Sequence, residues 1–154
     1  MTRSRTRWEP LGEESIGFLL VHSAQGWIRC LEQALRPLGL THLQFALMAA
    51  TALLVHQGET PHQGRLAAFT GFDRFMVSRS LGLLLKRRLL MRTKHPSVPR
   101  GHLISLTPHG RDTLDAARPL YDKAMLDYFG SIDDKQLAAA AKTLRLLLEH
   151  THRR

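Results

Sequence analysis

The sequence predicts a mainly α-helical protein with six helices and one short β-hairpin. Hydrophobic residues make up 44% of the chain and aromatic residues only 6%, a composition that suits packed helices. Apolar residues recur at helical spacing along most of the 154 residues. Between residues 89 and 106 this spacing gives way to two short strand-like runs around a loop with two prolines and a glycine. These observations favour one helical domain that carries one hairpin.

The first two helices are predicted from an apolar stripe and from end signals. The stripe of the first helix, expected over about residues 12–37, consists of Ile16, Leu20, Ser23, Trp27, Leu31 and Leu35. Pro37 and Gly39 are the stop signals of this helix. Thr41, with Gln44 three residues later, makes a capping box that starts the second helix.

The third and fourth helices are predicted to be short and closely spaced. Thr60 is expected to cap the third helix, with Pro61 in its first position. Gly71 ends this helix, and Asp73 caps a fourth helix that reaches about Arg88. A short helix, a tight turn and a longer helix in this order form a helix-turn-helix.

The hairpin and two long helices complete the chain. The predicted strands are Leu89–Lys94 and His102–Leu106, and their place directly after the fourth helix makes the motif a winged helix-turn-helix. The fifth helix starts at Pro108 and ends near Gly130, and Ser131 caps the sixth. The apolar stripe of the sixth helix consists of Leu137, Ala141, Leu144 and Leu148. The stripes of the first and sixth helices suit packing between two chains or the core of a monomer.

Nearly all of the excess positive charge lies in one segment. The formal net charge is +9, from 22 lysines and arginines against 13 acids. Ten of these bases and a single acid, Asp73, fall between residues 60 and 111, so the remaining 12 bases and 12 acids cancel. A neutral scaffold with one cationic segment indicates a surface for a large anion, and nucleic acid is the commonest one. The alternative is an ordinary solvated face.

The predicted fourth helix has two different faces at about 100° per residue. Val77, Leu81 and Leu84 fall on one side, which is expected to pack against the second and third helices. The opposite side is short, polar and cationic, as insertion into a DNA major groove requires. The predicted DNA-binding residues of this helix are Arg74, Phe75, Ser78, Arg79 and Gly82.

Most of these residues admit a second interpretation. Arg79 contacts a guanine or a phosphate, or it is an ordinary surface arginine. Ser78 bonds DNA or faces solvent, and Phe75 touches a thymine methyl group or packs on the preceding turn. Gly82 costs up to about 1 kcal/mol relative to alanine inside a helix, so it either admits a close backbone approach or has no role. Arg74, at the helix start, is expected to meet phosphate.

The hairpin supplies three further candidates for DNA contact, Lys94, His95 and Arg100. Arg100 lies at the predicted wing tip, where an arginine can enter a minor groove and respond to its width and negative potential. The alternative is that Arg100 braces the wing against the body of the domain.

From Leu40 to Leu114 the chain resembles the winged-helix core of MarR-family transcriptional regulators. The matching segments are LTHLQFALM, HQGRLAAFTGFDRFMVSRSLGLLLKRRLLMR and RGHLISLTPHGRDTL. The flanking helices are similar to the dimerisation region of that family, so the resemblance covers nearly the whole chain. It implies a single MarR-type domain over residues 9–152, with the winged helix-turn-helix over about 41–107 and dimerisation helices over about 12–37 and 108–150.

The resemblance also implies partners. We expect a homodimer with intertwined first and last helices that binds double-stranded DNA at a pseudo-palindromic site. The resemblance implies repression of nearby genes, with activation as the open alternative, and a small aromatic or phenolic effector that weakens DNA binding. His22, Trp27 and His42 are candidates for the effector pocket, although core packing explains them equally well. One departure is Val98, which stands where the family usually has an aspartate two residues before the wing arginine.

No catalytic residue, cofactor or metal site is predicted. The nine histidines match no zinc-binding spacing and have no thiol partners. The lone Cys30 cannot form an intrachain disulfide, which fits a reducing cytoplasm, and it is either an inert thiol or a redox sensor. No run approaches the ~18 apolar residues of a membrane span and no secretory signal is recognisable, so no membrane partner is expected.

Two other classes of protein stay open. A winged-helix protein-interaction module would bind DNA weakly and without sequence preference. A small enzyme that uses its histidines would show turnover or stoichiometric metal. The order of helices and strands around the cationic segment favours a DNA-binding regulator over both.

Overall fold

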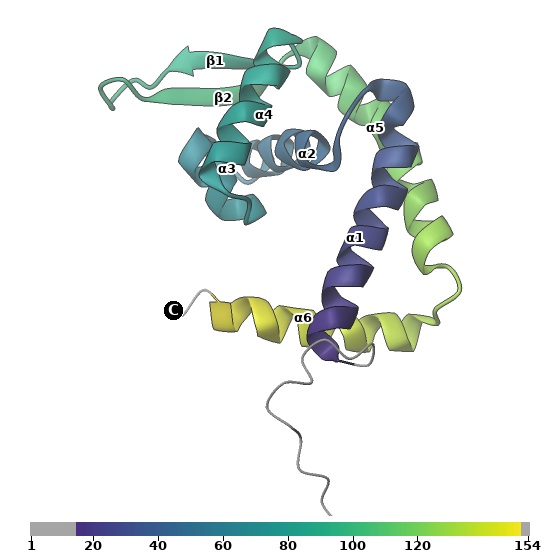
Figure 1. Cartoon of the computed structure of the whole chain (residues 1–154). Helices are drawn as coiled ribbons and strands as arrows, with labels where there is room; N and C mark the ends of the chain where they lie inside the picture. The colour runs from purple at the N-terminus through teal and green to yellow at the C-terminus, as the bar shows by residue number, and fades with distance from the viewer. Residues whose placement is uncertain (1–14, 152–154) are drawn as a thin grey trace, which may run out of the picture.

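The computed structural model describes residues 15–151. These residues form six α-helices, one short 3-10 turn and a two-stranded antiparallel hairpin (Figure 1). In chain order the elements are α1 (Ile16–Leu35), η1 (Arg36–Leu38), α2 (His42–His56), α3 (Gln63–Thr70), α4 (Arg74–Lys86), β1 (Leu90–Lys94), β2 (His102–Leu106), α5 (Pro108–Phe129) and α6 (Asp134–Thr151). This order confirms the predicted fold class, a mainly α winged helix-turn-helix.

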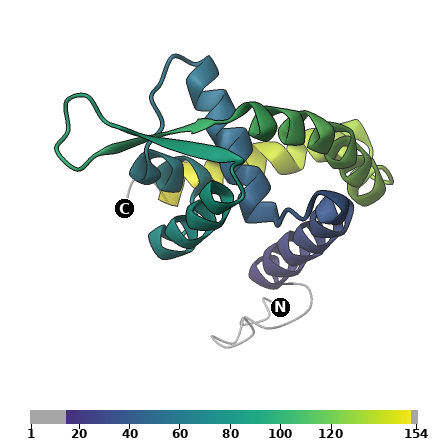
Figure 2. The same ribbon diagram turned by 90° about the horizontal axis from the view of Figure 1, so that it is seen from above.

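The elements fall into two groups. α1 and α5 lie side by side, whereas α2, α3, α4 and the hairpin form the winged helix-turn-helix (Figure 1). α2 contacts α1, α3, α4, α5 and β2, so it connects the two groups. The hairpin extends beyond the helices, which is clearest from above (Figure 2). α6 lies at the end of the α1–α5 pair that is away from the hairpin (Figure 1).

Local capping chemistry explains why three helices begin where the sequence predicts. The Thr41 hydroxyl accepts a hydrogen bond from the backbone N–H of Gln44, whose side chain accepts one from the backbone N–H of Thr41. The Asp73 carboxylate accepts from the first backbone N–H groups of α4, and Thr107 caps α5 in the same way. Gly71, with φ of +73°, supplies the left-handed residue that ends α3.

The predicted start of the third helix is wrong. α3 begins at Gln63 and not at Thr60, and His62 caps it through its side chain. Pro61 is buried before the helix, and its carbonyl oxygen accepts a hydrogen bond from the backbone N–H of Ile104 in β2 (2.8 Å). A carbonyl that pairs with a strand cannot also sit in the first turn of a helix. Tertiary pairing therefore overrides the local capping signal.

The limits of the first and last helices also differ from the prediction. α6 begins at Asp134, because the carboxylate of Asp133, and not Ser131, accepts the hydrogen bond that caps it. α1 begins at Ile16, with Ser15 as its cap. The predicted positions before residue 15, including the domain start at residue 9, and the domain end at residue 152 lie outside the described residues.

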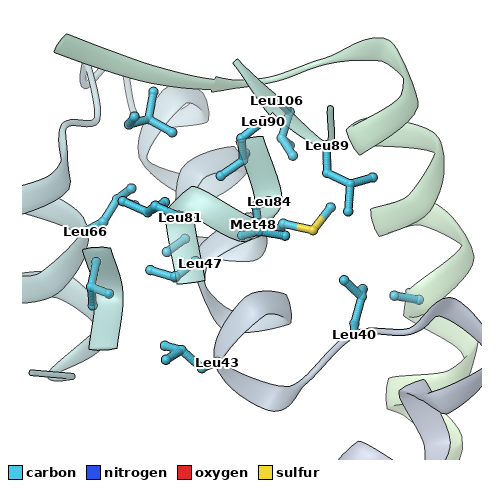
Figure 3. Packing of buried hydrophobic residues seen from close by; sticks show 14 of the residues in the cluster. Leu40, Leu43, Leu47, Met48, Leu66, Leu81, Leu84, Leu89, Leu90 and Leu106 are labelled. Atoms are coloured by element: carbon cyan, nitrogen blue, oxygen red, sulfur yellow. The ribbon is translucent and has the colours of Figure 1, made fainter. Parts of the chain in front are cut away.

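The core lies where α2, α3 and α4 meet the base of the hairpin (Figure 3). Most of its side chains are leucines, which fill the space between helices in well-defined rotamers. The largest fully buried ones are Leu35, Leu47, Met48, Leu54, Leu66, Leu81, Leu84, Leu89, Leu90 and Ile104. α2, the first helix of the winged helix-turn-helix, supplies more buried residues than any other helix.

The base of the wing is fixed to the rest of the domain. In the hairpin Leu90 pairs with Leu106, and both side chains are buried. The hydroxyl of Thr107 donates to the Arg88 carbonyl oxygen (2.6 Å), which joins the start of α5 to the turn that follows α4. These contacts hold the wing at a defined angle to α4.

No single helix among residues 15–151 is long and apolar enough to cross a membrane. Ile16–Leu38 and His42–His56 meet the length and composition requirement only as a pair, across a bend of 78°. The side chains of α2 that supply most of that hydrophobicity belong to the core.

Candidate nucleic-acid interface

The two faces of α4 are as predicted. Val77, Leu81 and Leu84 are fully buried against the core. Ser78, Arg79 and Gly82, together with Phe75 and Arg74, are exposed on the other side. A helix anchored by one apolar stripe, with short polar and cationic side chains outside, can enter a major groove without disturbing its packing.

The N-terminal turn of α4 is firmly built. The Asp73 carboxylate accepts hydrogen bonds from the backbone N–H groups of Phe75 (2.8 Å) and Met76 (3.2 Å). The Phe75 ring is 76% exposed, so it does not pack on the preceding turn. The ring and the neighbouring Arg74 are therefore free to meet a ligand at this end of the helix.

The wing loop is closed by hydrogen bonds between its own residues. The backbone N–H of His95 donates to the Gly101 carbonyl oxygen, and that of Gly101 to the Val98 carbonyl oxygen, both at 2.9 Å. The His95 ring accepts at Nδ1 from the backbone N–H groups of Ser97 and Val98, each at 3.1 Å. Arg100 is exposed at the tip with φ of +60°. Among residues 15–151, no carboxylate takes part in closing this loop.

The structure divides the cationic segment into engaged and available bases. Arg65 makes two hydrogen bonds to the Glu59 carboxylate (2.6 and 2.8 Å), and this arginine lowers the pKa of Glu59. The Arg87 guanidinium donates to the carbonyl oxygens of Leu38 and Gly39, between α1 and α2. These arginines hold the fold, so charge counting overstated the number of bases available to a ligand.

A cleft of about 410 Å³ separates the wing from the start of α3. Arg92 and His102 of the two strands line it, together with Arg100 and His95 of the loop. Arg92 belongs to the cationic segment of the sequence, but it was not among the predicted DNA-binding residues. Its position on β1, facing this cleft, depends on the strand register, which the sequence left unspecified.

Comparisons with known proteins identify the family. No protein-family model matches the chain. A curated relative, the uncharacterized HTH-type transcriptional regulator YdcH of Bacillus subtilis (strain 168), is 35% identical over 136 residues, which is 88% of this chain and 91% of YdcH. A solved MarR-family transcriptional regulator from Rhodococcus sp. RHA1 is 30% identical, covers 86% of this chain and 91% of its own, and has a TM-score of 0.76. The chain belongs to the MarR family of transcriptional regulators.

Two further solved structures resemble the chain and concern small ligands. CouR from Rhodococcus jostii RHA1, bound to p-coumaroyl-CoA, is 30% identical with a TM-score of 0.75 over 88% of this chain and 92% of its own. BpsR from Bordetella bronchiseptica, whose DNA binding is regulated by 6-hydroxynicotinic acid, is 26% identical with a TM-score of 0.76 over 86% of this chain and 97% of its own. As a MarR-family protein, this chain is a DNA-binding transcriptional regulator.

A larger cavity lies between α2, β2 and α5, apart from the α4 face. Its volume is about 900 Å³. Phe45 and Tyr121 form an aromatic pair in its lining, with ring centroids 5.5 Å apart and planes 25° apart. Arg111, Arg118 and His56 supply basic groups. Sequence reasoning missed this cavity, because its lining joins α2 to β2 and α5, which lie far from α2 in the chain.

The three residues predicted as pocket candidates lie elsewhere. His22 is exposed and stacks on Phe18 within α1. The ring of Trp27 packs against α5, with the ring of Tyr121 at 5.8 Å. His42 bonds to Glu32 at 2.9 Å. Core packing, the alternative interpretation, describes Trp27, whereas His22 and His42 make local contacts outside the core.

The remaining candidate chemistry can be located as well. Cys30 is half-buried in α1, and its Sγ atom donates to the Ala124 carbonyl oxygen of α5 at 3.7 Å. Within residues 15–151, no three histidine, cysteine, aspartate or glutamate side chains gather closely enough to hold a metal ion.

Proposed function

We propose that this regulator acts as a homodimeric repressor of nearby genes, which binds a pseudo-palindromic operator and leaves it when a small aromatic or phenolic acid binds. In this proposal Arg74, Phe75, Ser78, Arg79 and Gly82 of α4 face the major groove. Lys94 and Arg100 of the wing meet the adjacent minor groove. The winged helix-turn-helix spans about residues 41–107, and the long helices on either side hold the two chains together.

The observation that carries the proposal is the exposed outer face of α4. Arg79 and Ser78 stand there side by side without a protein partner among the described residues. A guanidinium with all its donors free can make a bidentate contact to guanine O6 and N7. Gly82, one turn further on, leaves the helix backbone bare on the same face, so bases can approach closely.

Exposed apolar surface supports the homodimer. Outside the winged helix-turn-helix, Ile16 of α1 is 78% exposed and Leu126 of α5 is 71% exposed. The outer leucines of α6, including Leu144, are also exposed, and α6 packs little against the rest of the described chain. A monomer does not leave such a surface uncovered, whereas two intertwined copies bury it. Two α4 helices in such a dimer would enter successive major grooves about one DNA turn apart.

The cavity between α2, β2 and α5 is the proposed effector site. Its Phe45–Tyr121 pair offers an aromatic surface, and the Arg118 guanidinium can bind a carboxylate through two parallel hydrogen bonds. The ligands of CouR and BpsR support the aromatic class. α2 and β2 belong to the winged helix-turn-helix, whereas α5 does not. A ligand bound between them would therefore favour one distance between the two α4 helices of the dimer. Arg118→Ala should then abolish release by an aromatic acid without weakening operator binding.

Titration of labelled DNA tests the main proposal. Wild-type protein is titrated with the region upstream of its own gene and with a scrambled version over a series of salt concentrations. Affinity should fall steeply with salt for both DNAs, and the true site should be preferred by about 10³-fold or more. Equal affinity for both would favour the protein-interaction module instead.

A further inference from the structure

The tip of the wing is organised around one side chain. Of the residues from 95 to 100, His95 alone is half-buried, and its ring turns into the loop. Its Nδ1 atom accepts two backbone hydrogen bonds, from Ser97 and Val98. A Cβ atom on Gly101 would lie 3.0 Å from the His95 Cβ atom and 2.9 Å from the Val98 Cβ atom, so the two sides of the loop pack tightly.

We propose that His95 is the positioning residue of the wing: its Nδ1 atom closes the loop that presents Arg100 to DNA, and the ring itself contacts no base. The proposal rests on the proposed function in one respect, the contact between Arg100 and DNA. It gives His95 a different role from the predicted DNA contact, because the Nδ1 acceptor of its ring is occupied within the loop.

Arg100 needs such support. Its φ of +60° lies in the left-handed region, which is unfavourable for a residue with a side chain. A free loop would relax away from this conformation and move the guanidinium. The two bonds to His95 fix Ser97 and Val98, and the bond from Gly101 to Val98 carries that constraint to the residue after Arg100. His95 therefore acts on Arg100 through the backbone.

This arrangement requires one protonation state of the ring. Nδ1 accepts hydrogen bonds only in the neutral tautomer that carries its proton on Nε2. In the imidazolium, Nδ1 is a donor, so both backbone N–H groups lose their acceptor. The other charged or titratable groups lining the cleft are Arg92 of β1, Arg100 of the loop, His102 of β2 and His62 before α3. The two arginines are donors only and cannot replace Nδ1 as an acceptor.

The ring nitrogens can be observed directly in the free protein. Nitrogen-15 spectra of the full chain, with the His95 signals assigned by comparison with His95→Asn, report which ring nitrogen carries the proton. We expect a single tautomer with the proton on Nε2. A mixture of tautomers, or a proton on Nδ1, would overturn the proposal whatever the DNA affinity turns out to be.

Three variants test the consequence for DNA. His95→Ala should weaken operator binding about tenfold near neutral pH, because two backbone hydrogen bonds are lost. His95→Asn should bind within about twofold of wild type, because an asparagine oxygen accepts from the backbone N–H two residues on. His102→Asn removes an imidazole from the same cleft without touching the loop, and it is the matched control.

A double variant separates this proposal from the proposed function. If His95 acts through Arg100, His95→Ala should cost nothing further in an Arg100→Ala background. If Arg100→Ala weakens binding and His95→Ala does not, the positioning role is wrong and the wing contact stands. If Arg100→Ala binds like wild type, the wing contact fails and the positioning role fails with it.

Discussion

Replacing Gly82 with alanine should make the protein more stable and a poorer DNA binder. Gly82 lies in the interior of α4, and nothing lies within 4 Å of the position a Cβ atom would take. The substitution is therefore free of clashes, and it should recover about 1 kcal/mol of helix propensity. For a chain of this length that corresponds to a rise in Tm of about 2–4 °C.

The effect on DNA should have the opposite sign. The new methyl group would stand on the same face as Ser78 and Arg79, where the backbone is proposed to approach the bases. Operator affinity should fall by about 1 kcal/mol or more, the cost of disturbing one base contact. Calorimetry at a fixed protomer concentration gives the Tm, and fluorescence anisotropy gives the affinity.

Gly110→Ala is the matched control for the stability measurement. A Cβ atom on Gly110 would lie 1.9 Å from the backbone carbonyl oxygen of Leu89, so this variant should lose about 3 kcal/mol or more. If Gly82→Ala raised the Tm but left operator affinity unchanged, the proposed close approach would be wrong. A lower Tm would contradict the assignment of the faces of α4.

The remaining predictions concern stability and assembly. Arg87→Ala removes the hydrogen bonds to the Leu38 and Gly39 carbonyl oxygens, so it should lower the free energy of unfolding in urea by about 1–2 kcal/mol. Arg87→Lys should show an intermediate loss, because an ammonium cannot donate to both carbonyl oxygens in the fixed geometry of a guanidinium. Hydrogen bonds from His42 hold the pKa of Glu32 below its usual value of 4.5, so the carboxylate adds stability that is present above that value and is lost as pH falls through the lowered pKa. Glu32→Gln should remove this part of the acid dependence, and an unchanged slope of stability against pH would refute it. Leu144→Glu should shift sedimentation from dimer to monomer, whereas Ala139→Glu, on the opposite side of α6, should not.

The sequence predicts the elements whose ends depend on neighbouring residues. Thr41 and Asp73 cap their helices within three residues of themselves, so no tertiary information is needed. The start of α3 could not be predicted, because it depends on a bond between Pro61 and Ile104 of the second strand. Ser131 failed for a simpler reason, since Asp133 is an equally good cap two residues later.

The outline of the candidate site could be predicted because it depends on residues that are close together in the chain. The buried and exposed faces of α4 follow from helical periodicity alone, and the structure confirms them. The sequence could count the bases but not their partners, so it did not reveal that Arg65 and Arg87 are engaged within the fold. It also left Val98 unexplained. The structure shows that His95 closes the wing loop at that point.

Arg79→Ala provides the most direct test of the claim that the outer face of α4 reads DNA sequence. Its affinity is measured for the operator and for scrambled DNA, with Lys94→Ala as the comparison. We predict that Arg79→Ala loses about 1–3 kcal/mol on the operator and much less on scrambled DNA, so that the preference shrinks. Lys94→Ala should weaken both DNAs alike. An Arg79→Ala protein with wild-type affinity and preference would contradict the account.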